Sequence, residues 1–279
     1  MTAAVPREIT HIGRGDDSDT NASSERQSPH RTALPSPVMP VPASDLIIAI
    51  VVIAIAALVQ GVVGIGFNVV AVPILLLVNP LLAPVPSLLL AVPLTIWQLL
   101  RERGEIDWSG VGWILLGRLP GGLIGLGLLL VLSSRVLDIA IAVIVLLAVV
   151  IIGSGVAVHR TRTAGFGTGV VSGITGIVGA IGGPPVGILY RDTPGPLMRS
   201  TVAVVFSVGL LMSIGLRAVG GKVAATDLEI AILLLPAMVI GFAASNRLKD
   251  RFEGPGIRRG ILFISTLAAA TLLLQGILA

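Results

Sequence analysis

The pattern of apolar and charged positions divides the chain into long uncharged stretches separated by short polar connections. Positions 46–100, between Asp45 and Arg101, form a run of 55 uncharged residues. A helix needs about 20 apolar residues to cross a bilayer, so two spans joined by a tight turn would use about 40. The surplus length predicts a third, shorter element within this stretch.

The glycine-rich segment "QGVVGIGFNVVAVP" at 60–73 is the natural position for a break, because glycine loosens a helix and permits a turn. We therefore predict an arm over about 46–63, a returning arm over 67–79 and a full span over 81–100. The later apolar stretches predict further spans at about 110–131, 136–158, 195–217, 227–247 and 258–278.

A second interruption, "GAIGGPPVGILYRD" at 179–192, lies inside the otherwise apolar segment 165–190. Proline removes a backbone N–H and collides with the preceding turn, so we expect the helix to break at Gly182–Pro185. Unpaired backbone in hydrocarbon costs several kcal/mol per group and is tolerated where it lines a cavity within the protein. The interruption therefore marks a candidate functional site.

The two interruptions belong to an internal repeat. Matching helix breakers recur in the same order, which predicts a duplicated unit of about four helical segments whose first segment is broken. The units cover 45–158 and 165–279. A shift of 112 residues aligns Gly61 with Gly173, Gly64 with Gly176 and Pro73 with Pro185, and a shift of 116 aligns Pro120 with Pro236 and Gly125 with Gly241.

The distribution of basic residues indicates how the two units are related. If each broken segment is a hairpin, the connections on one side carry 11 Lys and Arg residues against three on the other. If each broken segment crosses the membrane, the count becomes about eight against six. The positive-inside rule favours hairpins, with the two units inverted and both termini outside. The connections on the basic side are 100–109, 159–164, 189–199 and 247–259.

Composition supports an all-α polytopic membrane protein. The chain is 54% hydrophobic and 12% charged, with a mean hydropathy of +0.98, whereas ordinary soluble domains carry about 25% charged residues. Residues 1–44 are rich in Ser, Pro and charge and are predicted to form a disordered tail. The excess of basic residues does not indicate nucleic-acid binding, because these residues lie at the ends of apolar segments.

The residues that could carry catalysis are scattered. The chain has no cysteine and no GxxxxGK[ST] loop, and its three histidines lie in the tail and in one connection. No carboxylates cluster within the spans, and Asp138 lies near the end of one. We therefore predict no enzyme activity, no cofactor, no metal site and no buried carboxylate dedicated to proton coupling.

Arg118, in "LLGRLPGG", is the charge embedded most deeply in a predicted span. An arginine within the membrane indicates a functional site, and its natural partner is an anion. The alternative is snorkelling, since Arg118 lies about eight residues, or ~12 Å, into its span.

The two breaks supply the other candidate binding groups. A broken helix exposes N–H groups and a positive dipole end, which can hold an anion; the alternative is that the glycines only allow close helix packing. Gln60 and Ser172, which are polar residues near the breaks, could contact substrate or satisfy loosened backbone, and both roles stay open. The candidate substrate-binding residues are Gly64, Gly66, Asn68, Pro73, Arg118, Thr175, Gly179, Gly182, Gly183 and Pro184.

The segments "GVVGIGFNVVAVPILL" and "GFGTGVVSGITGIVGAIGGPPVGILY" resemble the two repeats of the sulfite exporter TauE/SafE family of bacterial membrane permeases. The resemblance extends over nearly everything from residue 45 onward. It implies a duplicated permease of the bacterial inner membrane that exports sulfite or organosulfonate anions. The sequence departs from the family at 67–69, where Phe, Asn and Val replace a denser glycine run.

Together these features predict a secondary transporter for a small anion, such as sulfite or an organosulfonate, held near the membrane midplane by the two breaks. The partners expected are this anion and the lipid bilayer, not nucleic acid, and a homo-oligomer is compatible with the sequence. The alternatives are a passive anion channel, a membrane-embedded enzyme and a membrane scaffold that does not transport.

Overall fold

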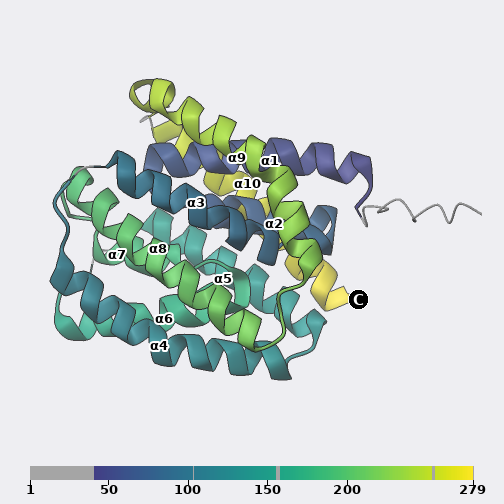
Figure 1. The fold of residues 1–279 in the computed structure, drawn as a ribbon, viewed down its shortest axis with the longest axis horizontal. Coiled ribbons are helices and arrows are strands. Elements are labelled where there is room, and N and C mark those ends of the chain that lie inside the picture. The colour runs from purple at the N-terminus through teal and green to yellow at the C-terminus, as the bar shows by residue number, and fades with distance from the viewer. Residues whose placement is uncertain (1–40, 103, 155–157, 253–254, 279) are drawn as a thin grey trace, which may run out of the picture. The chain divides into compact units, whose positions relative to one another are not determined.

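The computed structural model describes residues 41–102, 104–154, 158–252 and 255–278. The predicted tail at 1–44 therefore lies almost entirely outside the described residues. Within the described ranges the chain is helical and contains no strand, as the sequence predicts (Figure 1).

Ten α-helices and one short 3₁₀ helix make up the described chain, and their bounds follow the predicted segments closely. The elements are α1 (Ala43–Val63), α2 (Phe67–Val78), η1 (Pro80–Leu82), α3 (Val85–Arg101), α4 (Trp108–Val131), α5 (Ser134–Ser154), α6 (Arg162–Gly179), α7 (Gly183–Leu189), α8 (Gly195–Val219), α9 (Ala225–Phe252) and α10 (Pro255–Leu278). Among the residues that the structure describes, six helices are long and apolar enough to cross a membrane, namely α1, α3 with the preceding η1, α4, α5, α8 and α9.

The first break separates α1 from α2 and forms a hairpin. Gly64 and Gly66 have φ values of +90° and +120°, which glycine adopts far more readily than residues with a side chain. Asn79, which follows α2, donates from Nδ2 to Oδ2 of Asp45 in the first turn of α1, at 3.1 Å. Because the end of α2 lies beside the start of α1, the chain returns to the end from which it set out.

The second break, between α6 and α7, falls two residues earlier than "GGPP" predicts. Helix α6 ends at Gly179, and Ala180 takes the left-handed conformation, with φ of 59°. Pro184 and Pro185 do not interrupt a helix, because they occupy the first turn of α7, where an N–H has no intrahelical partner to lose. Ser172, in the middle of α6, donates to the Gly182 carbonyl at 2.6 Å, so this segment also folds back.

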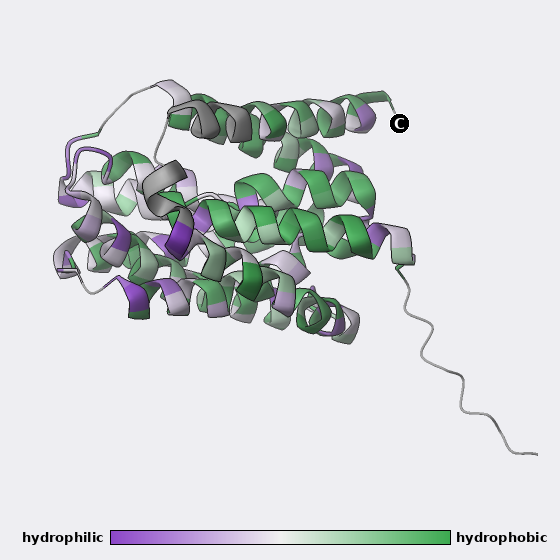
Figure 2. Cartoon of the chain, turned by 90° about the horizontal axis from the view of Figure 1, so that it is seen from above, coloured by the Kyte–Doolittle hydropathy of each residue, from purple (hydrophilic) through white to green (hydrophobic). Residues whose placement is uncertain are grey.

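Contacts between connections place the basic segments at one end of the helices, as the hairpin interpretation predicts. Arg101 donates to Asn246 at 2.9 Å, Glu102 pairs with Arg199, and Tyr190 donates to Asp107 at 2.9 Å. The starts of the two predicted units, in α1 and α6, thus lie at opposite ends of the helices. Figure 2 shows apolar residues along the helices and hydrophilic residues gathered toward the connections.

The spacing between corresponding landmarks of the two breaks is 116 residues, not the 112 that the glycine alignment gives. The left-handed residues Gly64 and Ala180 are 116 apart, and so are the first residues of α2 and α7. A single shift of 116 residues therefore aligns the breaks as well as the later segments of the predicted repeat, without a change of register. The duplication itself stays a prediction.

Glycines bring two pairs of helices into backbone contact. A Cβ atom on Gly117 of α4 would lie 2.1 Å from the Phe166 carbonyl oxygen of α6, and one on Gly121 would lie 2.2 Å from that of Val170. Gly241 of α9 approaches α1 in the same way, since its Cβ would lie 2.0 Å from the Ala54 oxygen. At these positions the glycines allow the helices to pack closely, which is the alternative role considered for them in the sequence.

The close contact between α4 and α6 predicts a position-specific effect of alanine substitution. Gly121→Ala should lower the thermal midpoint of the purified protein, because the added methyl group meets backbone that cannot move aside, at a cost of about 1–3 kcal/mol. Gly127→Ala, in the same helix, meets nothing within 4 Å and should leave the midpoint unchanged or slightly raised. Equal midpoints for both variants in a thermal melt would contradict the packing.

Candidate functional site

A cavity of about 50 Å³ lies between the two breaks. On this measure about 10–15 Å³ holds one water, so a small oxoanion fits. Both breaks contribute to its wall, together with α3, α4 and α8. The lining residues are Gln60, Gly66, Phe67, Asn68, Val69, Leu88, Ala91, Leu94, Thr95, Arg118, Gly176, Ala180, Ile181, Gly182, Gly183, Phe206, Leu210 and Ser213.

Arg118 is the charged group of this wall. Its side chain does not snorkel, because the residue is only 3% exposed and its guanidinium is held inside the bundle. It donates to the Ser172 hydroxyl at 2.6 Å and to the Gly209 carbonyl at 3.1 Å. Neither Asp nor Glu occurs among the described residues that line the cavity. A buried cation whose partners are neutral dipoles gains much from a nearby anion.

The amino-terminal end of α2 forms another part of the wall. Phe67, Asn68 and Val69 are its first three residues, and all three line the cavity. The Phe67 N–H donates to Oε1 of Gln60 at 3.0 Å, whereas the next two N–H groups lie in the first turn, where no intrahelical acceptor exists. This end of α2 therefore presents backbone donors and the positive end of a helix dipole to the cavity.

The start of α7 is chemically different from the start of α2. Pro184 and Pro185 have no N–H, so two of the donors that a helix normally offers in its first turn are missing. The guanidinium of Arg118 lies here instead, since a Cβ on Gly182 would be 3.0 Å from Nη1. The first break thus offers backbone donors, as predicted for both breaks. At the second break the guanidinium of Arg118 supplies the positive charge in place of the missing backbone donors.

Asn68 links the two breaks. Its Nδ2 donates to the Ala180 carbonyl at 2.9 Å, which fixes the amide orientation. Its buried Oδ1 has no hydrogen-bond partner among the described residues. The same side chain therefore satisfies one loosened carbonyl and carries an unused acceptor.

Half of the predicted binding residues lie on the cavity wall. Gly66, Asn68, Arg118, Gly182 and Gly183 line it. The others lie nearby without lining it: Gly64 ends α1, Pro73 is buried inside α2, Thr175 donates to Val171 of its own helix, Gly179 ends α6 beside Ile141, and Pro184 lines a separate apolar groove.

Sequence reasoning missed the contribution of α3 and α8 to the wall. Thr95 of α3 lines the cavity and accepts a hydrogen bond from Ser207 of α8 at 3.3 Å. Ser213 lines it as well and lies within hydrogen-bond distance of Arg118. The signal available in the sequence was the presence of hydroxyl residues within two otherwise apolar predicted spans.

A second buried arginine, Arg217, stabilises the end of α6. It is the last residue of the span predicted over 195–217, and its side chain is buried and donates to the carbonyls of Ile177 and Val178. These carbonyls form the negative end of the α6 dipole, so a cation is favourable there.

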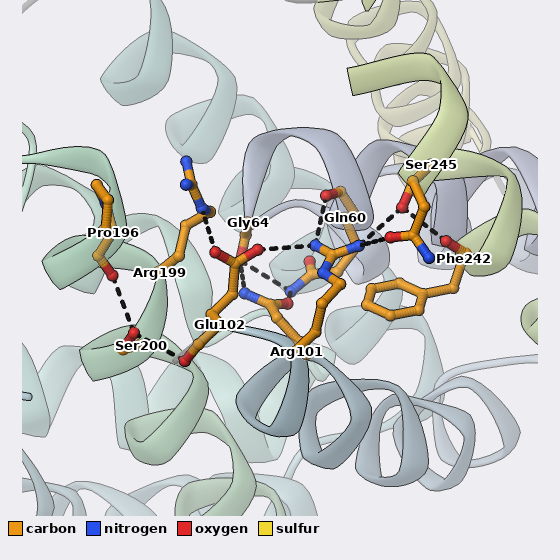
Figure 3. Close-up of polar contacts among 12 residues, drawn as sticks. Gln60, Gly64, Arg101, Glu102, Pro196, Arg199, Ser200, Phe242 and Ser245 are labelled. Carbon is orange, nitrogen blue, oxygen red and sulfur yellow. Dashed lines mark hydrogen bonds and ion pairs between the residues drawn. The ribbon is translucent and has the colours of Figure 1, made fainter. Parts of the chain in front are cut away.

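A polar cluster surrounds the first break (Figure 3). The side-chain amides of Gln60 and Gln98 both donate to the Gly64 carbonyl, at 2.9 and 3.1 Å. Beyond them Glu102 lies between Arg101 and Arg199, and its side chain is only 8% exposed. Sequence reasoning missed this buried carboxylate, because Glu102 follows α3 directly and folds inward.

Fold and site together define the class of protein. A multi-pass helical membrane protein with two interrupted segments around a shared polar cavity has the architecture of a transporter. The model of the family described as Sulfite exporter TauE/SafE matches residues 49–272, so the chain belongs to this family of membrane transporters. The resemblance found in the sequence is thereby confirmed. The comparisons with curated proteins and with solved structures each returned no match.

The position of Arg217 predicts a stabilising role. Arg217→Met should lower the thermal midpoint, because it leaves the Ile177 and Val178 carbonyls without donors, at a cost of about 1–3 kcal/mol. Arg162→Met removes an exposed arginine and should have little effect. A melt in which both variants match the wild type would refute this role.

Proposed function

We propose that the protein is a secondary permease that exports a small anion, such as sulfite or an organosulfonate, across the bacterial inner membrane. The observation that carries this proposal is the buried Arg118 on the wall of the cavity shared by both breaks, with neutral groups as its recorded hydrogen-bond partners. Family membership supports transport and supplies the expected direction.

The electrostatics of the cavity favour an anion. A guanidinium in a medium of low polarity interacts strongly with an opposite charge, since little water screens it. The backbone donors at the start of α2 lie on the same wall and add the favourable end of a helix dipole. An oxoanion with several acceptor oxygens uses both groups at once.

The cavity volume favours a compact substrate. About 50 Å³ accommodates an anion of the size of sulfite more readily than a long organosulfonate. The apolar part of the wall, which includes Leu94, Phe206 and Leu210, leaves a short aliphatic group as the larger alternative. Sulfite is therefore the substrate to test before the others.

Reconstituted transport provides the decisive test. Wild-type protein in liposomes should release trapped sulfite, and Arg118→Leu should reduce the initial rate at least about tenfold, because the cavity loses its cation. Arg162→Leu removes an exposed arginine and serves as the matched control. Sulfite release that is equal in wild type, Arg118→Leu and empty liposomes would refute the proposal.

A carrier and a channel differ in exchange behaviour. A carrier should show saturating flux and should accumulate labelled sulfite transiently against an opposing gradient of unlabelled sulfite. Flux that rises linearly with concentration, without counterflow, would identify a passive channel instead. Folded protein that moves none of the tested anions would favour the scaffold.

A glycine facing Arg118 offers a test that leaves the arginine in place. A Cβ on Gly209 would lie 2.5 Å from Cζ of Arg118, so Gly209→Ala should displace the guanidinium and lower sulfite flux by about tenfold. Gly215→Ala, in the same helix, has nothing within 4 Å and should transport normally. The measurement is initial efflux normalised to folded protein, and unchanged flux in Gly209→Ala would argue against a role for the position of Arg118.

A further inference from the structure

The Arg101–Glu102–Arg199 cluster has the geometry of an oxoanion site. Each oxygen of the Glu102 carboxylate is held by a different arginine: Oε1 lies 3.0 Å from Nη2 of Arg101, and Oε2 lies 2.8 Å from Nε of Arg199 (Figure 3). The carboxylate thus bridges two guanidinium groups that come from α3 and α8. Oxoanions present oxygens to arginine in the same manner.

The cluster lies directly behind the cavity. Gln60 lines the cavity and contacts both the Gly64 carbonyl and Gln98. On the other side of Gly64 is Arg199, whose Cγ would be 3.0 Å from a Cβ at this glycine. Arg101 Nη2 also donates to the Gly61 carbonyl at 2.7 Å. One turn of α1 and its amide contacts therefore separate the cavity from the cluster.

The two arginines retain capacity for an anion. Nε of Arg101 is buried and has no hydrogen-bond partner among the described residues, while its guanidinium lies 4.4 Å from the centre of the Phe242 ring. Arg199 is the more exposed of the two, with 26% of its side chain accessible, so it faces the basic end. Arg101 is thus the more buried cation and Arg199 the more exposed one, and both contact the same carboxylate.

Glu102 is able to leave this position without unfolding a helix. It is the residue that caps the end of α3, with φ of −87° and ψ of 89°; its N–H donates to the Gln98 carbonyl at 2.9 Å, whereas its side chain takes no part in the helix. Ser200 accepts from the N–H of Gly104 at 3.1 Å and donates to the Glu102 carbonyl at 3.1 Å, which anchors the backbone and not the carboxylate. Release of the carboxylate from both arginines therefore requires a change of side-chain rotamer but breaks no helical hydrogen bond.

We propose that Arg101 and Arg199 form a second oxoanion-binding site, at the basic end of the protein, which Glu102 occupies at rest. An anion on its way between this end and the cavity displaces the carboxylate, so Glu102 closes the route when no anion is present. This inference rests on the proposed transport function, and it assigns the anion a site distinct from the cavity at Arg118.

Cysteine accessibility tests the closure without requiring transport. The chain has no cysteine, so a single Thr95→Cys substitution on the cavity wall reports access to the cavity. Vesicles of both orientations would be treated with a membrane-impermeant thiosulfonate. Exposed Glu105→Cys, in a separate variant, identifies the vesicles that present the basic end. In these vesicles Glu102→Gln should raise the labelling rate of the Thr95→Cys protein about tenfold. The neutral glutamine amide binds Arg101 and Arg199 less strongly than the carboxylate does, so the route to the cavity opens more often.

The matched control is Glu105→Gln, which neutralises an exposed carboxylate in the same connection and should leave the labelling rate unchanged. Added methanesulfonate, an organosulfonate that does not react with thiosulfonates as sulfite does, should accelerate labelling in the Glu102-containing protein and should have little further effect in Glu102→Gln. A rate that Glu102→Gln does not change, or that methanesulfonate does not raise in the Glu102-containing protein, would overturn the proposal. Thermal melts of each variant show whether it is folded.

Flux measurements separate failure of this inference from failure of the proposed function. Glu102→Gln should lower the sulfite concentration that gives half-maximal efflux several-fold, because the anion no longer competes with an internal carboxylate. If the wild type exports sulfite and folded Glu102→Gln has the same half-maximal concentration, only the second site is overturned. No efflux of any tested anion from wild type would instead overturn the transport function.

Discussion

The need to satisfy backbone groups at two interrupted helices is the constraint on which the rest of the structure depends. Each break leaves carbonyls at the end of one helix and N–H groups at the start of the next, and lipid offers these groups no partner. Buried polar side chains donate hydrogen bonds to these carbonyls: Gln60 and Gln98 at the first break, and Arg217 and Ser172 at the second. These side chains make the bundle interior polar at the depth where the cavity lies.

The two breaks contribute to the cavity wall by different chemical means. The first exposes the backbone start of α2, whereas the second begins with two prolines and relies on the guanidinium of Arg118. Asn68 joins them through the Ala180 carbonyl, so the amide of one break completes the backbone of the other. The cavity therefore has a backbone side and a side-chain side, and the proposed anion would contact both.

The sequence predicted the helices well because apolar length and glycine or proline interruptions are local signals. It also predicted Arg118 as a candidate, since a charge inside an apolar span stands out. It could not predict that Glu102 turns inward or that Thr95 meets the cavity, because these outcomes depend on which helices pack together. The exact position of the second break was missed for a related reason: prolines were read as helix breakers, although they are equally suited to a first turn.

The glycine contacts between helices have a mechanical consequence. Helix α4 contacts α6 backbone to backbone, and α9 contacts α1 in the same way. Each tightly packed pair thus combines one helix from each of the two predicted units. A motion that separated residues 45–158 from 165–279 as two blocks would therefore have to break both of these backbone contacts.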